Sequence, residues 1–340
     1  MNNTKNATRV GDFPKIDLEE CARRIRDTRR PLILMHVRPD GDTVGTAAAL
    51  CRIFTRMGRH PYYACPDRIP ERLSFLTEGL ECAIDPETRE PLTNLSELEP
   101  IAVDVPSIGQ LGFISELVTV GLTVDHHAVS TPYSPHYTVA GASSAGEVLL
   151  GITELLAEWG EITLDREIAE PLYAAIASDT GGFAYSSATP TTYRRAAALI
   201  ELGIDHTDIC RRLFSSKSRD QLRAEGYVAS KMQTDADGRI AYFTLSLAER
   251  ESLGLDHAHF ECAIDVVRSL IGCELAMTVK EAEPGSYKAS LRSTGPNVAE
   301  VAAKHSGGGH ALAAGCSPVG GSVGEAAESL LCDLRKLLKM

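Results

Sequence analysis

Short apolar runs alternate with helical segments through the first half of the chain, and this alternation restricts the fold more than any other feature. The runs lie at 31–35, 61–65, 101–103 and 122–124. The helical segments lie at about 46–57, 144–159 and 167–178, and another begins at Thr189, followed by Pro190. Strands that are apolar throughout are typical of parallel sheets, which are buried on both faces. We therefore predict an α/β domain with a mainly parallel sheet flanked by helices.

A charged helical segment and a smaller α+β domain are expected to follow. The predicted boundaries are 15–200 for the first domain, 201–236 for a helical linker and 237–340 for the second domain, and a length of 340 residues suits two domains. Strands are expected at 240–245, 274–279 and 287–292, with Pro284-Gly285 turning a hairpin between the last two. Helices are expected at about 258–271, 298–304 and 324–338.

Composition excludes several classes of protein. The net charge of −12 argues against a protein that coats long nucleic acid, although a local basic pocket for a short anion remains possible. The nine cysteines include no CxxC pair, which argues against zinc-ribbon and thioredoxin-type sites and favours free thiols in a reducing compartment. The first 17 residues lack the apolar core of a signal peptide, and no apolar run is long enough to span a membrane. We expect a cytoplasmic protein without membrane contact.

Acidic and histidine side chains follow three of the predicted strands. They are His36, Asp40 and Asp42 after the first, Asp104 after the run 101–103, and Asp125, His126 and His127 at the end of 122–124, with Asp179 just after the helix 167–178. Alone, each signal is weak, since the Pro39-Asp40-Gly41-Asp42 stretch also suits a simple turn. Ligands bind at the carboxyl ends of strands in open α/β sheets, so we expect these side chains to lie together.

Such a cluster predicts a divalent metal site. Carboxylates that gather without a cation repel one another and raise each other's pKa. Aspartate and histidine without cysteine suit Mn²⁺ or Mg²⁺, and imidazole shifts the preference toward Mn²⁺, Fe²⁺ or Co²⁺. Two ions about 3.5–4 Å apart can bind both the attacking and the leaving oxygen at a phosphorus centre. Six candidates fit two ions: His36, Asp40, Asp42, Asp104, His126 and Asp179.

Four stretches of the chain resemble the motifs of the DHH phosphoesterase family. They are HVRPDGDTVGT, VDVPS, VDHHAVS and ASDTGGF. The later stretch KHSGGGHALAAG, preceded by Arg292-Ser293, resembles the DHH-associated substrate domain with its GGGH motif. The resemblance covers residues 15 to 335. By size and motif order the chain looks most similar to the stand-alone branch that cleaves very short oligonucleotides (nano-RNase) and dephosphorylates 3′-phosphoadenosine 5′-phosphate (pAp).

The resemblance implies a role for each motif residue. It implies two divalent ions, Mn²⁺ before Mg²⁺, Co²⁺ or Fe²⁺, with Asp104 bridging them. The first ion would be held by His36, Asp40 and Asp104, and the second by Asp42, Asp104, His126 and Asp179. His127 would contact the scissile phosphate, and Asp125 would orient a histidine. Phosphate and sugar would be bound by Arg292, Ser293, Gly307, Gly308, Gly309 and His310. The resemblance also implies a homodimer.

The predicted substrate contacts have their own physical reason. Glycines let backbone N–H groups approach an anion closely, and an arginine offers a bidentate fork to phosphate. Lys288, Lys304 and His305 would add positive charge to an acidic chain. The alternative is that the three glycines form only a flexible turn.

The chain departs from the family pattern at three positions. Gln110 stands where an arginine is common, Arg38 where asparagine is common, and Ser306 where glycine is common. Arg38 is a candidate to bind phosphate in place of an arginine at position 110. These changes affect the expected substrate preference and leave the metal chemistry unaffected.

Several functions remain open on the sequence. The leading prediction is a Mn²⁺-dependent hydrolase of short RNA or DNA oligonucleotides, pApA or pAp. The alternatives are a cyclic-dinucleotide phosphodiesterase and a non-catalytic nucleotide sensor. An inorganic pyrophosphatase is disfavoured by the GGGH stretch. A RecJ-type exonuclease on long strands is disfavoured because no extra nucleic-acid-binding domain is present.

Overall fold

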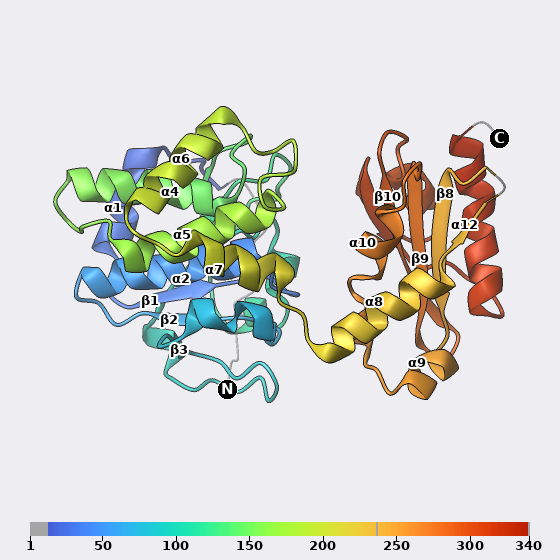
Figure 1. The fold of residues 1–340 in the computed structure, drawn as a ribbon. Helices are drawn as coiled ribbons and strands as arrows, with labels where there is room; N and C mark the ends of the chain where they lie inside the picture. The colour runs from blue at the N-terminus through green and yellow to red at the C-terminus, as the bar shows by residue number, and fades with distance from the viewer. Residues whose placement is uncertain (1–12, 236, 339–340) are drawn as a thin grey trace, which may run out of the picture. The chain divides into compact units, whose positions relative to one another are not determined.

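The computed structural model describes residues 13–235 and 237–338. Most of the N-terminal stretch used to argue against a signal peptide lies outside the described residues, as do residue 236 and the last two residues of the predicted domain 237–340. The chain divides into two compact units, 1–216 and 217–340 (Figure 1). No helix in the described ranges is long and apolar enough to cross a membrane. All nine cysteines are free thiols.

Six parallel strands form the sheet of the first unit, in the order β3-β2-β1-β4-β5-β6. Their bounds are β1 Pro31–Leu34, β2 Tyr62–Ala64, β3 Glu81–Cys82, β4 Glu99–Val103, β5 Leu122–Asp125 and β6 His136–Thr138. The chain runs outward from β1 to β3, then returns to β4 on the other side of β1. The pair β1 and β4 is therefore the topological switch point, where ligands bind in folds of this kind.

The long helices of this unit cover one face of the sheet. They are α1 Leu18–Asp27, α2 Gly41–Arg56, α4 Ala145–Glu158, α5 Arg166–Asp179 and α6 Pro190–Glu201. Residues of β1 alternate between two cores, since Ile33 faces these helices and Leu34 faces the opposite side. That opposite side is covered by loops and by η2 Leu95–Glu97, η3 Ile108–Leu111 and α3 Ile114–Leu117. The predicted α/β fold class is confirmed.

Helices α2 and α5 pack unusually closely because α2 carries glycines where it meets α5. A Cβ at Gly41 would lie 2.3 Å from Oγ of Ser178, and one at Gly45 would lie 2.6 Å from the carbonyl of Pro171. The start of α2 therefore lies against the end of α5. This packing brings the N-terminal turn of one helix next to the last residue of the other, Asp179.

The second unit holds a mixed sheet in the order β11-β12-β10-β9-β8-β7, and within the described strands only β8 and β9 are paired in parallel. Its strands are β7 Gln233–Thr234, β8 Ile240–Leu245, β9 Leu275–Glu283, β10 Ser286–Ser293, β11 Gly308–His310 and β12 Ala313–Cys316. The predicted hairpin at Pro284-Gly285 joins β9 to β10 and is confirmed.

Different helices cover the two faces of this sheet. On one face, α11 Ala299–Lys304 and α12 Val323–Leu337 pack over β8, β9, β10 and β12. On the other face, α8 Arg219–Lys231, η5 His257–Phe260 and α10 Ala263–Arg268 pack over β8 and β9. The described residues of the core on that second face include none from β10, β11 or β12. Helix α9, Leu247–Leu253, follows β8.

Some element bounds differ from the sequence expectations. The helix expected from residue 46 begins at Gly41, because the carboxylate of Asp40 accepts the N–H groups of Asp42 and Thr43 and caps it. The helix expected at 258–271 is divided into η5 and α10. In the segment 201–236, α7 His206–Cys210 and η4 Arg211–Ser215 belong to the first unit, whereas α8 belongs to the second. The first unit also contains η1, Glu71–Thr77.

Candidate metal centre

The predicted metal ligands meet at the carboxyl edge of the first sheet. His36 follows β1, Asp104 follows β4 and His126 follows β5, and these three strands are neighbours. Asp42 lies in the first turn of α2, and Asp179 is the last residue of α5. The close packing of these two helices brings their carboxylates to the same edge.

One group of ligand atoms consists of His36, Asp40 and Asp104. Nε2 of His36 lies 3.7 Å from Oδ1 of Asp40 and 3.4 Å from Oδ2 of Asp104. These separations are long for hydrogen bonds. They suit two ligand atoms that each lie about 2.1 Å from a shared ion.

A second group consists of Asp42, His126 and Asp179. Nε2 of His126 lies 3.7 Å from Oδ2 of Asp42 and 3.6 Å from Oδ2 of Asp179. The same nitrogen lies 3.5 Å from Oδ1 of Asp104. The geometry of this group thus repeats that of the first.

The carboxylate of Asp104 faces both groups, with Oδ2 toward His36 and Oδ1 toward His126. The side chain is buried, and its Oδ1 has no hydrogen-bond partner within the described chain. A buried carboxylate oxygen without a partner is costly unless a cation compensates it. The backbone of Asp104 is held at φ +59°, an uncommon conformation for a residue other than glycine. Its orphaned oxygen fits a ligand that bridges two ions.

Backbone carbonyls orient both candidate histidine ligands. Nδ1 of His36 lies 2.8 Å from the carbonyl of Val37, and Nδ1 of His126 lies 3.2 Å from that of Ala142. Because a carbonyl only accepts hydrogen bonds, Nδ1 carries the proton in each ring. Nε2 is then the ring atom that points into the site, as in metal-bound histidines whose other nitrogen is held by a carbonyl.

Asp42 is fixed by the start of helix α4. Its two carboxylate oxygens accept the N–H groups of Ala145 and Gly146 at 2.7 and 3.0 Å, and the hydroxyl of Thr46 at 3.1 Å. A helix N-terminus favours a negative charge. Sequence reasoning missed these partners. It located the helix start at Ser144, but no local signal links that start to a residue far back in the chain.

The electrostatics of the site favour cations. Burial and the carboxylates of Asp104 and Asp179 raise the pKa of Asp42 well above its ordinary value, and burial raises the pKa of Asp179 to about 6. Burial alone would lower the pKa of His36 and His126, but the carboxylates beside them outweigh it and raise both pKa values to about 10. The carboxylates and imidazoles of the site thus shift one another's pKa strongly, as expected for groups gathered around one point.

His127 has a different environment from His126. Its Nδ1 lies 2.8 Å from Oδ1 of Asp125, and this hydrogen bond raises the pKa of His127. The same carboxylate oxygen accepts the backbone N–H of His126 at 2.8 Å. Since Nδ1 is bound to Asp125, Nε2 is the atom of His127 that can meet a ligand. The half-buried side chain lies at the border of the site, with Nδ1 3.6 Å from Oδ1 of Asp104.

Two of the positions that depart from the family pattern are neighbours in space. The backbone N–H of Val37 donates to the carbonyl of Gln110 at 2.7 Å, so Arg38 begins next to Gln110. Arg38 is exposed, has φ +54°, and donates its N–H to Asp67. The backbone of residue 38 therefore lies close to the backbone of residue 110, and side chains at the two positions begin from neighbouring points.

The predicted substrate residues lie in the second unit. Arg292 on β10 and His310 on β11 are each paired with Ala313 of β12, so both face the same side of the sheet. Lys288 and Ser290 face that side as well, because residues two apart on a strand share a face. On this side, the buried apolar core beneath α8 and α10 takes its strand residues from β8 and β9. Ser293 ends β10, and its hydroxyl accepts the N–H of Gly295.

The three glycines of the GGGH stretch serve different needs. A Cβ at Gly307 would lie 2.1 Å from the carbonyl of Gly315, and one at Gly309, where φ is +138°, would lie 2.6 Å from that of Ala313. Both glycines are thus required by close backbone packing. A Cβ built at Gly308 would meet no atom within 4 Å. Of the three glycines, only Gly308 therefore leaves open space beside its backbone.

Lys304 and His305 were expected to add positive charge to the substrate site, but their side chains contact helix α12. Nε2 of His305 lies 3.1 Å from Oδ2 of Asp333, and Nζ of Lys304 lies 3.9 Å from Oδ1 of the same residue. Both side chains are therefore directed toward that helix. Lys288 instead lies on the face of Arg292, where its Nζ donates to Oγ of Ser317 at 2.9 Å.

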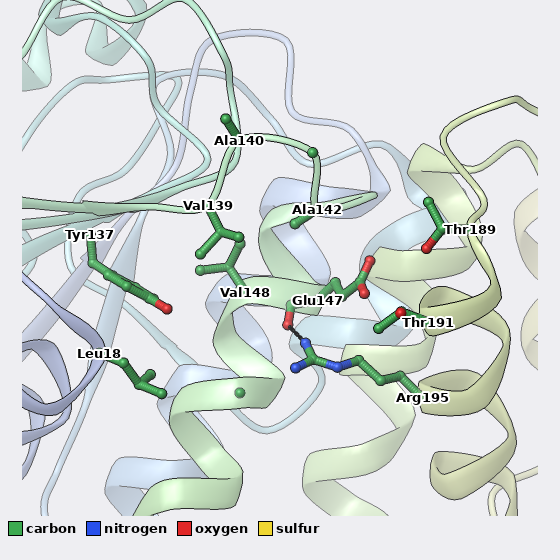
Figure 2. A pocket seen from close by; sticks show the side chains of 12 residues that line it. Leu18, Tyr137, Val139, Ala140, Ala142, Glu147, Val148, Thr189, Thr191 and Arg195 are labelled. Carbon is green, nitrogen blue, oxygen red and sulfur yellow. Dashed lines mark hydrogen bonds between the residues drawn. The ribbon is translucent and has the colours of Figure 1, made fainter.

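A pocket of about 360 Å³ lies beside the loop that orients His126 (Figure 2). The wall residue Ala142 is the one whose carbonyl holds His126. Arg195 in this pocket donates to the carbonyl of Glu147, and the buried Glu147 carboxylate accepts from Ser143 and Thr192. None of the predicted site residues lines the pocket, and its polar groups largely satisfy one another.

Comparison with known proteins agrees with this geometry. Residues 30–176 match the DHH family, N-terminal domain. The chain is 29% identical over 314 residues to the bifunctional oligoribonuclease and PAP phosphatase NrnA of Thermus thermophilus, covering 90% of this chain and 89% of that protein. It is 26% identical over 310 residues to the Bacillus subtilis protein of the same name, covering 89% and 93%.

The fold also matches a crystal structure of an exopolyphosphatase-related protein from Bacteroides fragilis. The TM-score is 0.84 at 23% sequence identity, over 95% of this chain and 97% of that chain. The likeness therefore extends to the fold of both units.

Proposed function

We propose that this chain is a phosphoesterase of the DHH family that hydrolyses short oligonucleotides such as pApA and removes a phosphate from pAp. The relatives named as oligoribonucleases and PAP phosphatases support this choice of substrates, because they align over about nine-tenths of the chain. The proposed cofactor is a pair of divalent ions, with Mn²⁺ as the first candidate.

The observation that carries the proposal is the position of Asp104. One of its carboxylate oxygens faces the group of His36 and Asp40, and the other faces the group of Asp42, His126 and Asp179. A shared carboxylate between two ligand groups is the arrangement required for two ions that act together. Such ions, when bound, neutralise phosphate oxygens and lower the pKa of water.

The residues of the chain itself then position the reacting phosphate. Asp125 holds His127 through Nδ1, so Nε2 of His127 is available to donate a hydrogen bond to an oxygen of the phosphate. Because Asp125 raises the pKa of His127, the ring favours its protonated form, which suits contact with an anion. Asp125 therefore acts as a positioning residue and His127 as the group that touches the substrate.

The second unit is proposed to bind the rest of the substrate. Arg292, whose Nη1 donates to the carbonyl of Leu291 at 3.0 Å, has five N–H groups with which a guanidinium can also bind a phosphate, and His310 lies in the same row of the sheet. Ser293 and the glycine stretch 307–309 complete the proposed contact set, with Gly308 as the position open to a ligand. Binding energy from a phosphate away from the reacting bond would orient that bond.

Parallel hydrolysis assays test the proposal. With Mn²⁺ present, pAp, pApA, a 20-nucleotide RNA and cyclic di-AMP are compared by chromatography. We expect turnover of pAp and pApA well above that of the 20-mer. Preference for cyclic di-AMP would instead assign a cyclic-dinucleotide phosphodiesterase, and binding of pAp without turnover of any substrate would assign a nucleotide sensor. Asp104→Asn serves as the inactive control, since it removes the shared carboxylate.

A further inference from the structure

The loop after Asp179 has an uncommon backbone. Gly181, Gly182 and Phe183 have φ values of +58°, +68° and +67°, so three consecutive residues are left-handed. Of these three residues, Phe183 adopts the conformation at the greatest cost in free energy, because a side chain disfavours it. The hydroxyl of Tyr193 donates to the carbonyl of Phe183 at 3.0 Å, and the Phe183 ring packs 5.9 Å from that of Tyr173. These contacts hold the strained turn in place.

Two large rings cover the glycines of this turn. A Cβ at Gly181 would lie 2.5–2.7 Å from ring atoms of Tyr185, and one at Gly182 would lie 3.5 Å from the ring of Phe214. The backbone N–H of Tyr185 donates to the carbonyl of Thr180 at 3.0 Å, which folds the loop back on the end of α5. The Tyr185 ring therefore rests on a residue only two positions beyond the metal ligand Asp179.

These rings are exposed, although aromatic side chains usually contribute to the core. Tyr185 is 48% exposed and Phe214 is 41% exposed. Within the described residues, the exposed aromatic side chains are Trp159, Tyr185, Tyr193 and Phe214. Three of the four surround this one turn, and Tyr193 is already bound to it. An exposed aromatic surface at the border of a phosphoesterase site suits a flat ligand.

We propose that Tyr185, assisted by Phe214, is a stacking surface for a nucleobase of the substrate. The inference rests on the proposed function, because the base belongs to the nucleotide whose phosphate lies at the metal centre. Bases stack on exposed aromatic rings with little regard to sequence, since every base has a flat π-face. Gly181 serves this arrangement directly, because any side chain there would displace the Tyr185 ring.

Matched substrates separate stacking from a structural role. The substrates are an RNA dinucleotide and two versions of it that each lack one base. We expect Tyr185→Ala to raise KM for the intact dinucleotide about 5- to 100-fold and to leave kcat/KM nearly unchanged for the version lacking the stacked base. Phe214→Ala should have a smaller effect in the same direction. Tyr185→Phe should behave as the wild type, and Trp159→Ala is the control for an exposed ring elsewhere. Equal losses on all three substrates, or no loss, would overturn the inference.

A second measurement does not depend on turnover. A 2-aminopurine base in the dinucleotide loses fluorescence when it stacks, so we expect quenching with the wild type and Tyr185→Phe and none with Tyr185→Ala. Hydrolysis by the wild type without quenching would reject the stacking surface and leave the proposed function standing. Quenching without hydrolysis would reject the proposed function and retain the surface.

Discussion

Arg292 and His310 lie in a single row of the second sheet, two strands apart and on the same face, with Ala313 between them. Neighbouring strands are about 4.8 Å apart, so the two backbones are separated by roughly 10 Å. The small Ala313 side chain leaves space between two long polar ones. This arrangement suits a phosphate group that is held from two sides.

Loss of Arg292 is expected to weaken substrate binding selectively. Arg292→Ala should raise KM for pAp about 10- to 100-fold, because a charge-assisted, bidentate contact is removed. Arg292→Lys should recover only part of the affinity, because lysine lacks the planar fork. Steady-state kinetics on pAp and on a simple phosphate diester without a second phosphate check this. An equal loss on both substrates would contradict the assigned role.

The glycine stretch allows fold and binding to be separated. Gly307→Ala should destabilise the second unit, because its Cβ would collide with the carbonyl of Gly315. Gly308→Ala should leave the melting temperature nearly unchanged and raise KM if a ligand approaches this backbone. Thermal unfolding and kinetics of the two variants provide the comparison. Wild-type KM in a folded Gly308→Ala variant would show that this glycine is not part of the substrate site.

The close approach of α2 and α5 can be tested at Gly45. Gly45→Ala places a Cβ 2.6 Å from the carbonyl of Pro171, so we expect a loss of about 1–3 kcal/mol in the free energy of unfolding. Activity should fall as well, since the two helices carry Asp42 and Asp179.

Gly226→Ala in α8 is the matched control. No atom lies within 4 Å of that Cβ, so this variant should gain up to about 1 kcal/mol. Denaturant unfolding measures both changes.

Divalent ions should stabilise the first unit through Asp104. With Mn²⁺ at about 100 times its dissociation constant, the free energy of unfolding should rise by about 2.7 kcal/mol. Asp104→Asn should abolish this gain. Without metal the variant should be no less stable than the wild type, because it removes one of several mutually repelling carboxylates. Differential scanning fluorimetry with Mn²⁺ or a chelator makes the comparison, and an undiminished shift in the variant would refute the bridging role.

Arg38 is predicted to bind phosphate in the role that an arginine at position 110 would fill. Arg38→Ala should lower kcat/KM on pAp about 10-fold or more, as expected when a charged group that binds phosphate is removed. The double variant Arg38→Asn with Gln110→Arg, which restores the family pattern, should recover activity. Recovery is expected because Val37 and Gln110 are hydrogen-bonded neighbours. If neither Arg38→Ala nor the double variant changes kcat/KM, Arg38 does not contact the substrate.

The parts of the site that follow a strand were predictable from the sequence. His36, Asp104 and His126 come directly after apolar runs, and parallel strands deliver such residues to one edge. Asp179 was predictable only as the end of a helix. Its approach to Asp42 depends on packing at Gly41 and Gly45, which no local pattern reveals.

The second unit was harder to predict for a different reason. Its strands β11 and β12 are rich in glycine and alanine, which have low strand propensity, so the GGGH stretch resembled a turn. Only the pairing with β10 shows that His310 and Arg292 share a face. The rings around this turn were similarly hidden, because Phe214 approaches Gly182 from a distant part of the chain.

The spread of the proposed ligands along the chain, from His36 to Asp179, would set the order in which the centre is assembled. During synthesis, the N-terminal residues leave the ribosome first. The proposed ligand that follows β1 therefore emerges early, while the one at the end of α5 emerges only when this unit is nearly complete. A nascent chain in the meantime carries a partial set of carboxylates with no stable place for a second ion. Full occupancy of the proposed metal centre would thus be a late event in biosynthesis that marks a finished first unit.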